Sequence, residues 1–204
     1  MENLKITDEH FKYLFVQKGD LSNIADRAEW EAAYNASTKR QLAGIVPWLR
    51  RSPANVLDIG SGLGGIGILL HKQFGCKVRL LDSIDEPPVC TKHDKPFCSM
   101  EVARDFYAHN GVTEGDFSYV SPHWQPTVSQ KFDLIVSFGS YCFHYAPEVY
   151  LERVKKVCNS DTVLIFHVRN RHDDWLCTLR EHFTEIGEQH HTPKFTERVF
   201  TCKT

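Results

Sequence analysis

The residues from Val56 to Gly65 read V-L-D-I-G-S-G-L-G-G and combine an acidic side chain with a glycine-rich turn. An apolar strand is predicted to end near Asp58, and an apolar stretch with helical character follows Gly65. Glycine lets the backbone turn tightly and lets a ligand approach without a Cβ atom in the way. The free N–H groups that open a helix favour anionic groups. We therefore expect a nucleotide-like cofactor at the carboxyl end of this first strand.

The spacing of the glycines fits two kinds of cofactor. Gly60-x-Gly62-x-x-Gly65 matches the dinucleotide fingerprint, and Asp82 follows at a plausible distance for a ribose contact. Asp58, however, stands two residues before the first glycine, where its carboxylate would repel a pyrophosphate. A ligand with a positive amino group suits that position better. An NAD-dependent oxidoreductase stays open as an alternative.

The resulting D-x-G-x-G-x-G pattern resembles motif I of the class I S-adenosylmethionine-dependent methyltransferases. In that family the loop surrounds the amino-acid end of S-adenosylmethionine, and an acidic residue at the end of the second strand binds the ribose hydroxyls. The resemblance implies that Asp82 holds the ribose. It also implies that the methionine end is lined by Asp58, Gly60, Ser61, Gly62 and Gly64.

The order of elements agrees with this resemblance. Residues 1–52 look mostly helical, with helices expected at 8–19, 22–34 and 37–50, and would form a lid or cap. Residues 53–204 alternate strands with helices and would form the cofactor-binding core of a single methyltransferase domain. We expect an α/β, Rossmann-like fold with a seven-stranded, mostly parallel sheet, helices on both faces and an antiparallel last strand. The predicted strands are 55–59, 77–81, 117–120, 132–138, 162–168, 183–189 and 198–201.

Composition limits the other classes of protein. The chain has 204 residues, of which 42% are hydrophobic, enough for one α/β core. Its formal net charge of −2 gives no basic footprint of the kind that nucleic-acid binders show. We expect no membrane span and no signal peptide. The seven scattered cysteines favour free thiols in the cytoplasm over a disulfide framework.

Ligands of such sheets bind outside the carboxyl ends of the strands, so further cofactor contacts are expected there. Ile84 would give the adenine an apolar face, and Ser121 would hydrogen-bond its edge. The full set of additional cofactor contacts is Ser83, Ile84, Ser121, Ser137 and Phe138.

The segment after the fourth predicted strand separates reaction classes. It lacks the Asn/Asp-Pro-Pro-aromatic signature of base amino methylation and the acidic ligands of metal-dependent O-methylation. It also lacks the Pro-Cys pair of pyrimidine C5 methylation, because no proline precedes Cys142. What remains is His144, whose imidazole can take a hydroxyl proton near neutral pH. The segment looks like that of several small-molecule and sugar O-methyltransferases, so we predict His144 as the general base. The alternative is a histidine that caps the next helix or packs in the lid.

Five residues are candidates for the acceptor pocket. His167 and Arg169 are two apart in a predicted strand and therefore share a face. An arginine there would suit an anionic or sugar-phosphate substrate, although a solvated strand end would look the same. The complete set is Tyr34, Tyr141, Tyr145, His167 and Arg169.

A long loop holds Cys90, His93 and Cys98, but their spacing matches no common zinc module, so we expect a lid and no metal. The sequence thus predicts an S-adenosylmethionine-dependent methyltransferase, with O-methylation of a small-molecule acceptor. A nucleic-acid methyltransferase, an NAD-dependent oxidoreductase and a non-catalytic binding module are the alternatives. The sequence does not define the acceptor or the oligomeric state.

Overall fold

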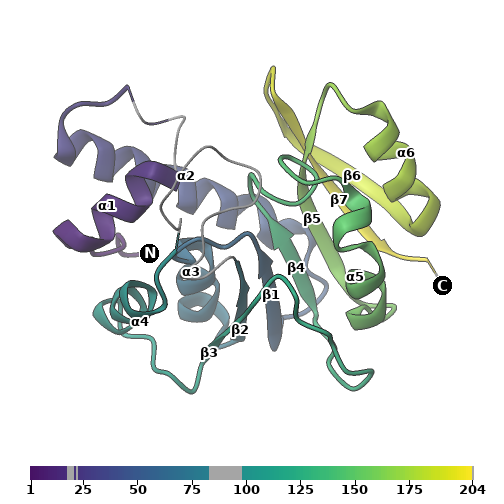
Figure 1. The fold of residues 1–204 in the computed structure, drawn as a ribbon, viewed down its shortest axis with the longest axis horizontal. Coiled ribbons are helices and arrows are strands. Elements are labelled where there is room, and N and C mark those ends of the chain that lie inside the picture. The colour runs from purple at the N-terminus through teal and green to yellow at the C-terminus, as the bar shows by residue number, and fades with distance from the viewer. Residues whose placement is uncertain (18–20, 22, 83–97, 204) are drawn as a thin grey trace.

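A computed structural model describes residues 1–17, 21, 23–82 and 98–203 (Figure 1). Its centre is a seven-stranded sheet with the strand order β3-β2-β1-β4-β5-β7-β6. The strands are β1 (Asn55–Ile59), β2 (Lys77–Leu81), β3 (Phe117–Val120), β4 (Leu134–Ser137), β5 (Val163–Arg169), β6 (Phe183–His191) and β7 (Phe195–Cys202).

The directions of the strands confirm the predicted topology. β1 to β5 pair in parallel, whereas β7 is antiparallel to both β5 and β6. The last strand is longer than predicted, since Phe195 already pairs with Arg169. Because β1 and β4 are adjacent in the middle of the sheet, the segments that follow them meet at one edge, where ligands of such folds bind.

Helices cover both faces of the sheet, as predicted. They are α1 (Asp8–Gln17), α2 (Arg27–Ile45), α3 (Gly65–Phe74), α4 (Met100–His109), α5 (Leu151–Val157) and α6 (Asp173–His182), with short 3₁₀ turns η2 (Val46–Trp48) and η3 (Pro147–Val149). In Figure 1 the purple to teal helices α1 to α4 lie on one side of the sheet, and the green helices α5 and α6 lie on the other. Each side has its own cluster of buried apolar side chains.

One prediction about the N-terminal helices is wrong. The helices expected at 22–34 and 37–50 are a single helix, α2, which begins after Asp26. Asp26 Oδ1 accepts a hydrogen bond from the Glu29 N–H at 2.8 Å, so Asp26 caps the helix. The polar residues in its middle do not break it, because Thr38 donates its hydroxyl to the Tyr34 carbonyl at 2.9 Å, within the same helix.

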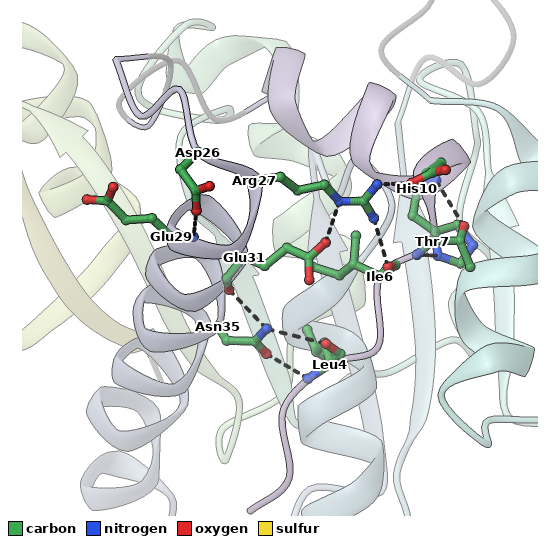
Figure 2. A network of polar contacts seen from close by, with 10 residues as sticks. Leu4, Ile6, Thr7, His10, Asp26, Arg27, Glu29, Glu31 and Asn35 are labelled. Atoms are coloured by element: carbon green, nitrogen blue, oxygen red, sulfur yellow. Dashed lines mark hydrogen bonds and ion pairs between the residues drawn. The ribbon is translucent and has the colours of Figure 1, made fainter.

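Two asparagine side chains tie the N-terminal segment to this layer. Asn35 of α2 accepts from the Leu4 N–H at 2.6 Å and donates back to its carbonyl at 3.3 Å. Asn110, after α4, pairs in the same way with both backbone groups of Lys5, at 2.9 and 3.1 Å. Figure 2 shows the Asn35 contact beside Arg27, which bonds Glu31 and the Ile6 carbonyl. The entry to α1 is therefore fixed by backbone-directed hydrogen bonds.

Candidate active site at the carboxyl ends of the strands

The glycine-rich turn between β1 and α3 has the backbone that its sequence predicts. Gly60, Gly62 and Gly64 have φ values of 71°, 56° and 75°, in the left-handed region that side chains disfavour. A Cβ atom on Gly60 would overlap the side chain of Ser140, which follows β4. The turn therefore needs glycine for two reasons, its backbone conformation and the close approach of the β4 loop.

Asp82, at the end of β2, is bonded directly to this turn. Its Oδ2 accepts a hydrogen bond from the Gly62 N–H at 2.6 Å, and the Leu81 carbonyl accepts from the Gly60 N–H at 2.7 Å. The carbonyl of Gly62 accepts from the Cys98 thiol at 3.1 Å. These contacts place a half-buried carboxylate beside the turn, at the edge where a ribose is expected.

Asp58 lies close beneath the same turn with only 3% of its surface exposed. Its charge contributes to the raised phenol pKa of Tyr34 and of Tyr107, although burial of the two rings is the larger cause. Two carboxylates, Asp58 and Asp82, thus make the turn negative. That potential fits a cofactor with a cationic amino-acid end and disfavours a pyrophosphate.

Two neighbours of the turn were not predicted. The side-chain amide of Gln17, the last residue of α1, lies against Gly62, and its Oε1 is 3.5 Å from the Leu63 N–H. Ser140 lies against Gly60, and its carbonyl accepts from the His144 N–H at 2.8 Å. Nothing in the sequence pattern of α1 indicates that its last residue reaches the turn.

The other predicted cofactor residues lie in different surroundings. Ser61 is half-buried in the turn, and Ser121 is exposed after β3. Ser137 is fully buried, and its hydroxyl donates to the Ile59 carbonyl at 2.8 Å while accepting from the Tyr141 N–H at 2.9 Å. This hydroxyl fastens the end of β4 to the end of β1. Ser83, Ile84, Cys90 and His93 lie outside the described residues.

Phe138 begins a row of rings along the ends of β4, β5 and β7. The centroids of the Phe138 and His167 rings are 5.0 Å apart in an edge-to-face arrangement. The His167 ring stacks on the Phe195 ring, with centroids 3.8 Å apart. Phe195 in turn meets Phe143 at 5.9 Å. This row forms an aromatic floor beside the β4 loop.

His144 projects from the β4 loop and is exposed. The pKa of its imidazole is lowered, mainly because the surrounding protein partly removes it from water and also because of the nearby Arg169 guanidinium. The guanidinium carbon of Arg169 lies 5.3 Å from the centroid of the Phe143 ring. The backbone N–H of Arg169 donates to the Cys142 carbonyl at 3.0 Å. The structure thus brings together His144, Arg169 and the aromatic floor.

Two of the three predicted tyrosines are buried, and the third lies in the same loop as His144. Tyr141 is fully buried and donates its hydroxyl to the Pro147 carbonyl at 3.0 Å. Tyr34 is also buried; it stacks on Trp30 with ring centroids 5.3 Å apart, and its hydroxyl lies against Gly65. Tyr145 is half-buried in the β4 loop, where its carbonyl accepts from the Cys142 N–H at 2.8 Å.

His167 forms a buried polar pair that was not predicted. Its Nε2 lies 3.2 Å from Glu197 Oε2 on β7, and the other carboxylate oxygen accepts from the Gln189 amide. Gln189 Oε1 accepts from the Trp48 indole N–H at 2.8 Å. A cavity of about 220 Å³ lies between this network and α2, near Gly44. The partners come from distant segments, so no local spacing could predict them.

Fold and site together define a Rossmann-like methyltransferase, and comparison with known proteins agrees. A family model described as a methyltransferase domain matches residues 28–199. The chain belongs to this family and is a class I S-adenosylmethionine-dependent methyltransferase. No curated protein matches the chain.

Solved structures share the fold at low sequence identity. The PH0226 protein from Pyrococcus horikoshii OT3 matches with a TM-score of 0.63 at 14% identity, covering 95% of this chain and 100% of that chain. The ribosomal protein L11 methylase from Lactobacillus delbrueckii subsp. bulgaricus has a TM-score of 0.57 at 24% identity, covering 80% and 77%. A putative tRNA (m1A22) methyltransferase from Streptococcus pneumoniae, in complex with S-adenosyl-L-methionine, has a TM-score of 0.52 at 18% identity, covering 72% and 65%.

None of the described helices has the length and hydropathy to cross a membrane. Among those same residues, no three His, Cys, Asp or Glu side chains are grouped so that they could hold a metal ion.

Proposed function

We propose that the protein transfers the methyl group of S-adenosylmethionine to a hydroxyl of a small-molecule acceptor, with His144 as the general base. One observation carries the proposal: the negative glycine turn and the exposed His144 belong to loops that touch each other through Gly60 and Ser140. A cofactor on the turn and an acceptor at His144 would therefore be neighbours.

The residues of the turn fit the cofactor chemically. Asp82 would hold the ribose hydroxyls, since a carboxylate accepts several hydrogen bonds at once. Asp58, Ser61 and the glycines would surround the cationic methionine end, and Gln17 would close it from the side of α1. When bound, the cofactor supplies a methyl group activated on a sulfonium. The main task of the protein is then to orient the acceptor.

His144 is suited to remove the proton of that acceptor. A lowered pKa keeps its imidazole neutral at pH 7, so a ring nitrogen can accept the hydroxyl proton as the oxygen attacks. Arg169 makes no ion pair with any of the residues that the structure describes. Its guanidinium would bind an anionic group of the acceptor, with Phe143 beneath it.

The cofactor assignment is tested by calorimetric titration of S-adenosylmethionine into the protein. Asp82→Ala should weaken binding about tenfold to a hundredfold, because charged hydrogen bonds to the ribose are lost. Asp161→Ala is the matched control, since this carboxylate is exposed at the opposite edge of the sheet. Equal affinities of the two variants would reject the ribose contact.

The acceptor assignment is tested with methyl-labelled S-adenosylmethionine and a panel of hydroxylated small molecules, with and without anionic groups. His144→Ala should lower turnover about a hundredfold and leave cofactor affinity unchanged. Label transferred to RNA or protein, with none on the small molecules, would reject a small-molecule acceptor while leaving the class of enzyme intact.

A further inference from the structure

Two cysteines meet at the edge of the sheet opposite the glycine turn. Cys158 ends α5 and is buried, whereas Cys202 is the last residue of β7 and is half-buried. Thr201 pairs with Val163 at the beginning of β5, so β7 ends where the parallel strands begin. The glycine turn follows the other end of β1, and the two sites are therefore separated by the length of the strands.

The register of β7 places Cys202 against the same buried cluster as Cys158. Cys202 lies two residues after Phe200, so both side chains point to the face of the sheet that α5 covers. Phe200 belongs to the same buried cluster as Val157 and Cys158, and Cys202 packs against this cluster. There the two side chains interact, and each thiol shifts the pKa of the other.

The interaction between the two thiols makes their pKa values unequal. The pKa of Cys202 is lowered, chiefly because the Cys158 thiol donates a hydrogen bond to it and also because of the Lys131 ammonium, while burial opposes the shift. The hydrogen bond and burial raise the pKa of Cys158. Lys131 Nζ is held there by the carbonyls of Lys156 at 2.8 Å and Cys158 at 2.9 Å.

Other cysteines in the described part of the chain have different surroundings. Cys76, Cys98 and Cys142 are buried, and burial raises the pKa of Cys76 to about 11 and that of Cys142 well above its usual range. Cys177 is exposed on α6. A thiolate that is partly accessible and lies near a cation is the reactive form of cysteine, and Cys202 meets both conditions.

We propose that Cys158 and Cys202 are a redox-active dithiol that a small disulfide, such as oxidised glutathione, converts into an intramolecular disulfide. The Cys202 thiolate attacks one sulfur of the oxidant, forms a mixed disulfide and releases one glutathione thiolate. Cys158 then loses its proton and its sulfur attacks Cys202 Sγ, which releases the second glutathione. Two protein thiols are oxidised, and one glutathione disulfide is reduced to two molecules of glutathione.

The disulfide would fasten β7 to the end of α5 without touching the cofactor site. It closes a long loop of chain, so it should raise the melting temperature by roughly 5–15 °C. Affinity for S-adenosylmethionine should stay within about twofold, because the glycine turn lies at the other edge of the sheet.

The experiment treats the full chain with oxidised glutathione, alkylates the remaining thiols and maps peptides by mass spectrometry. We expect a peptide pair joined through Cys158 and Cys202, which dithiothreitol should separate. The pair should be absent when the protein is oxidised in denaturant with the same reagent for the same time. Cys158→Ser should stop at a mixed disulfide on Cys202, and Cys177→Ser should still form the internal disulfide.

Glutathione attached to Cys177 alone, with both Cys158 and Cys202 alkylated, would overturn the proposal. So would a joined pair that forms to the same extent when the wild-type protein is oxidised in denaturant. Both results come from the wild-type chain and do not depend on whether the serine variants fold.

Discussion

The two halves of the candidate site are built in different ways. The cofactor half, at the ends of β1 and β2, depends on backbone: left-handed glycines and N–H groups that bond Leu81 and Asp82. The proposed acceptor half, at the ends of β4, β5 and β7, depends on side chains that come from separate elements, such as His167 and Glu197. A backbone site is encoded in adjacent residues, whereas a side-chain site exists only once the sheet has formed.

The largest expected effect comes from Gly60→Ala, which changes the backbone of the glycine turn in the cofactor half. The new Cβ would meet Ser140 at a left-handed φ, and the combined strain and overlap should lower the melting temperature by roughly 10–20 °C. Calorimetry should find the affinity for S-adenosylmethionine reduced more than about a hundredfold. Gly111→Ala is the matched control, because Gly111 also has a positive φ but open space around it. Similar losses in the two variants would mean that strain alone, and not the contact with the β4 loop, constrains Gly60.

Glu197→Ala removes a carboxylate from the side-chain network at the ends of β5 and β7. It leaves the buried His167 and the half-buried Gln189 without their acceptor, so the melting temperature should fall by roughly 5–15 °C. Cofactor affinity should change less than about twofold, because the network lies away from the glycine turn. Glu181→Ala, on the exposed face of α6, should leave both quantities unchanged. A large loss of cofactor affinity in Glu197→Ala would show that the two halves are coupled.

Gln17→Ala tests whether the end of α1 contributes to cofactor binding. Loss of the amide beside Gly62 should weaken cofactor binding about fivefold, the size of one net hydrogen bond. Val16→Ala is the control, since Val16 is exposed on the preceding position of the same helix. If calorimetry gives both variants the wild-type affinity, α1 covers the turn without binding the ligand.

The smallest expected effect is on the titration of His144. Arg169→Ala removes a positive neighbour, so the pKa of His144 should rise toward its ordinary value. Because the base must be neutral, any activity that depends on it would then be lost at a higher pH as the solution is acidified. Imidazole NMR signals followed against pH measure the shift directly, with Arg171→Ala as the control on the exposed neighbour. An unchanged midpoint in Arg169→Ala would remove Arg169 as a cause of the lowered pKa.

Predictions from the sequence succeeded where the pattern is local. The bounds of β1, β2 and β3 agree with those predicted, because apolar period and glycine position specify them within a few residues. The predicted break within α2 was wrong, since Thr38 satisfies its hydroxyl on the helix itself. Ser137 was predicted as a cofactor contact, but its buried hydroxyl donates to the Ile59 carbonyl and so joins β4 to β1. The residues around Ser137 in the sequence do not indicate this partner.

By itself the sequence determined the class of fold, the backbone of the glycine turn and the presence of Asp82 at the end of the neighbouring strand. These properties depend on residue conformation and on strand order, which local patterns encode. Only the tertiary structure decided that Gln17 reaches the turn, that Glu197 holds His167 and that Cys158 meets Cys202. Each of these contacts joins segments far apart in the chain, and side-chain neighbours of that kind are fixed by how the helices and strands pack.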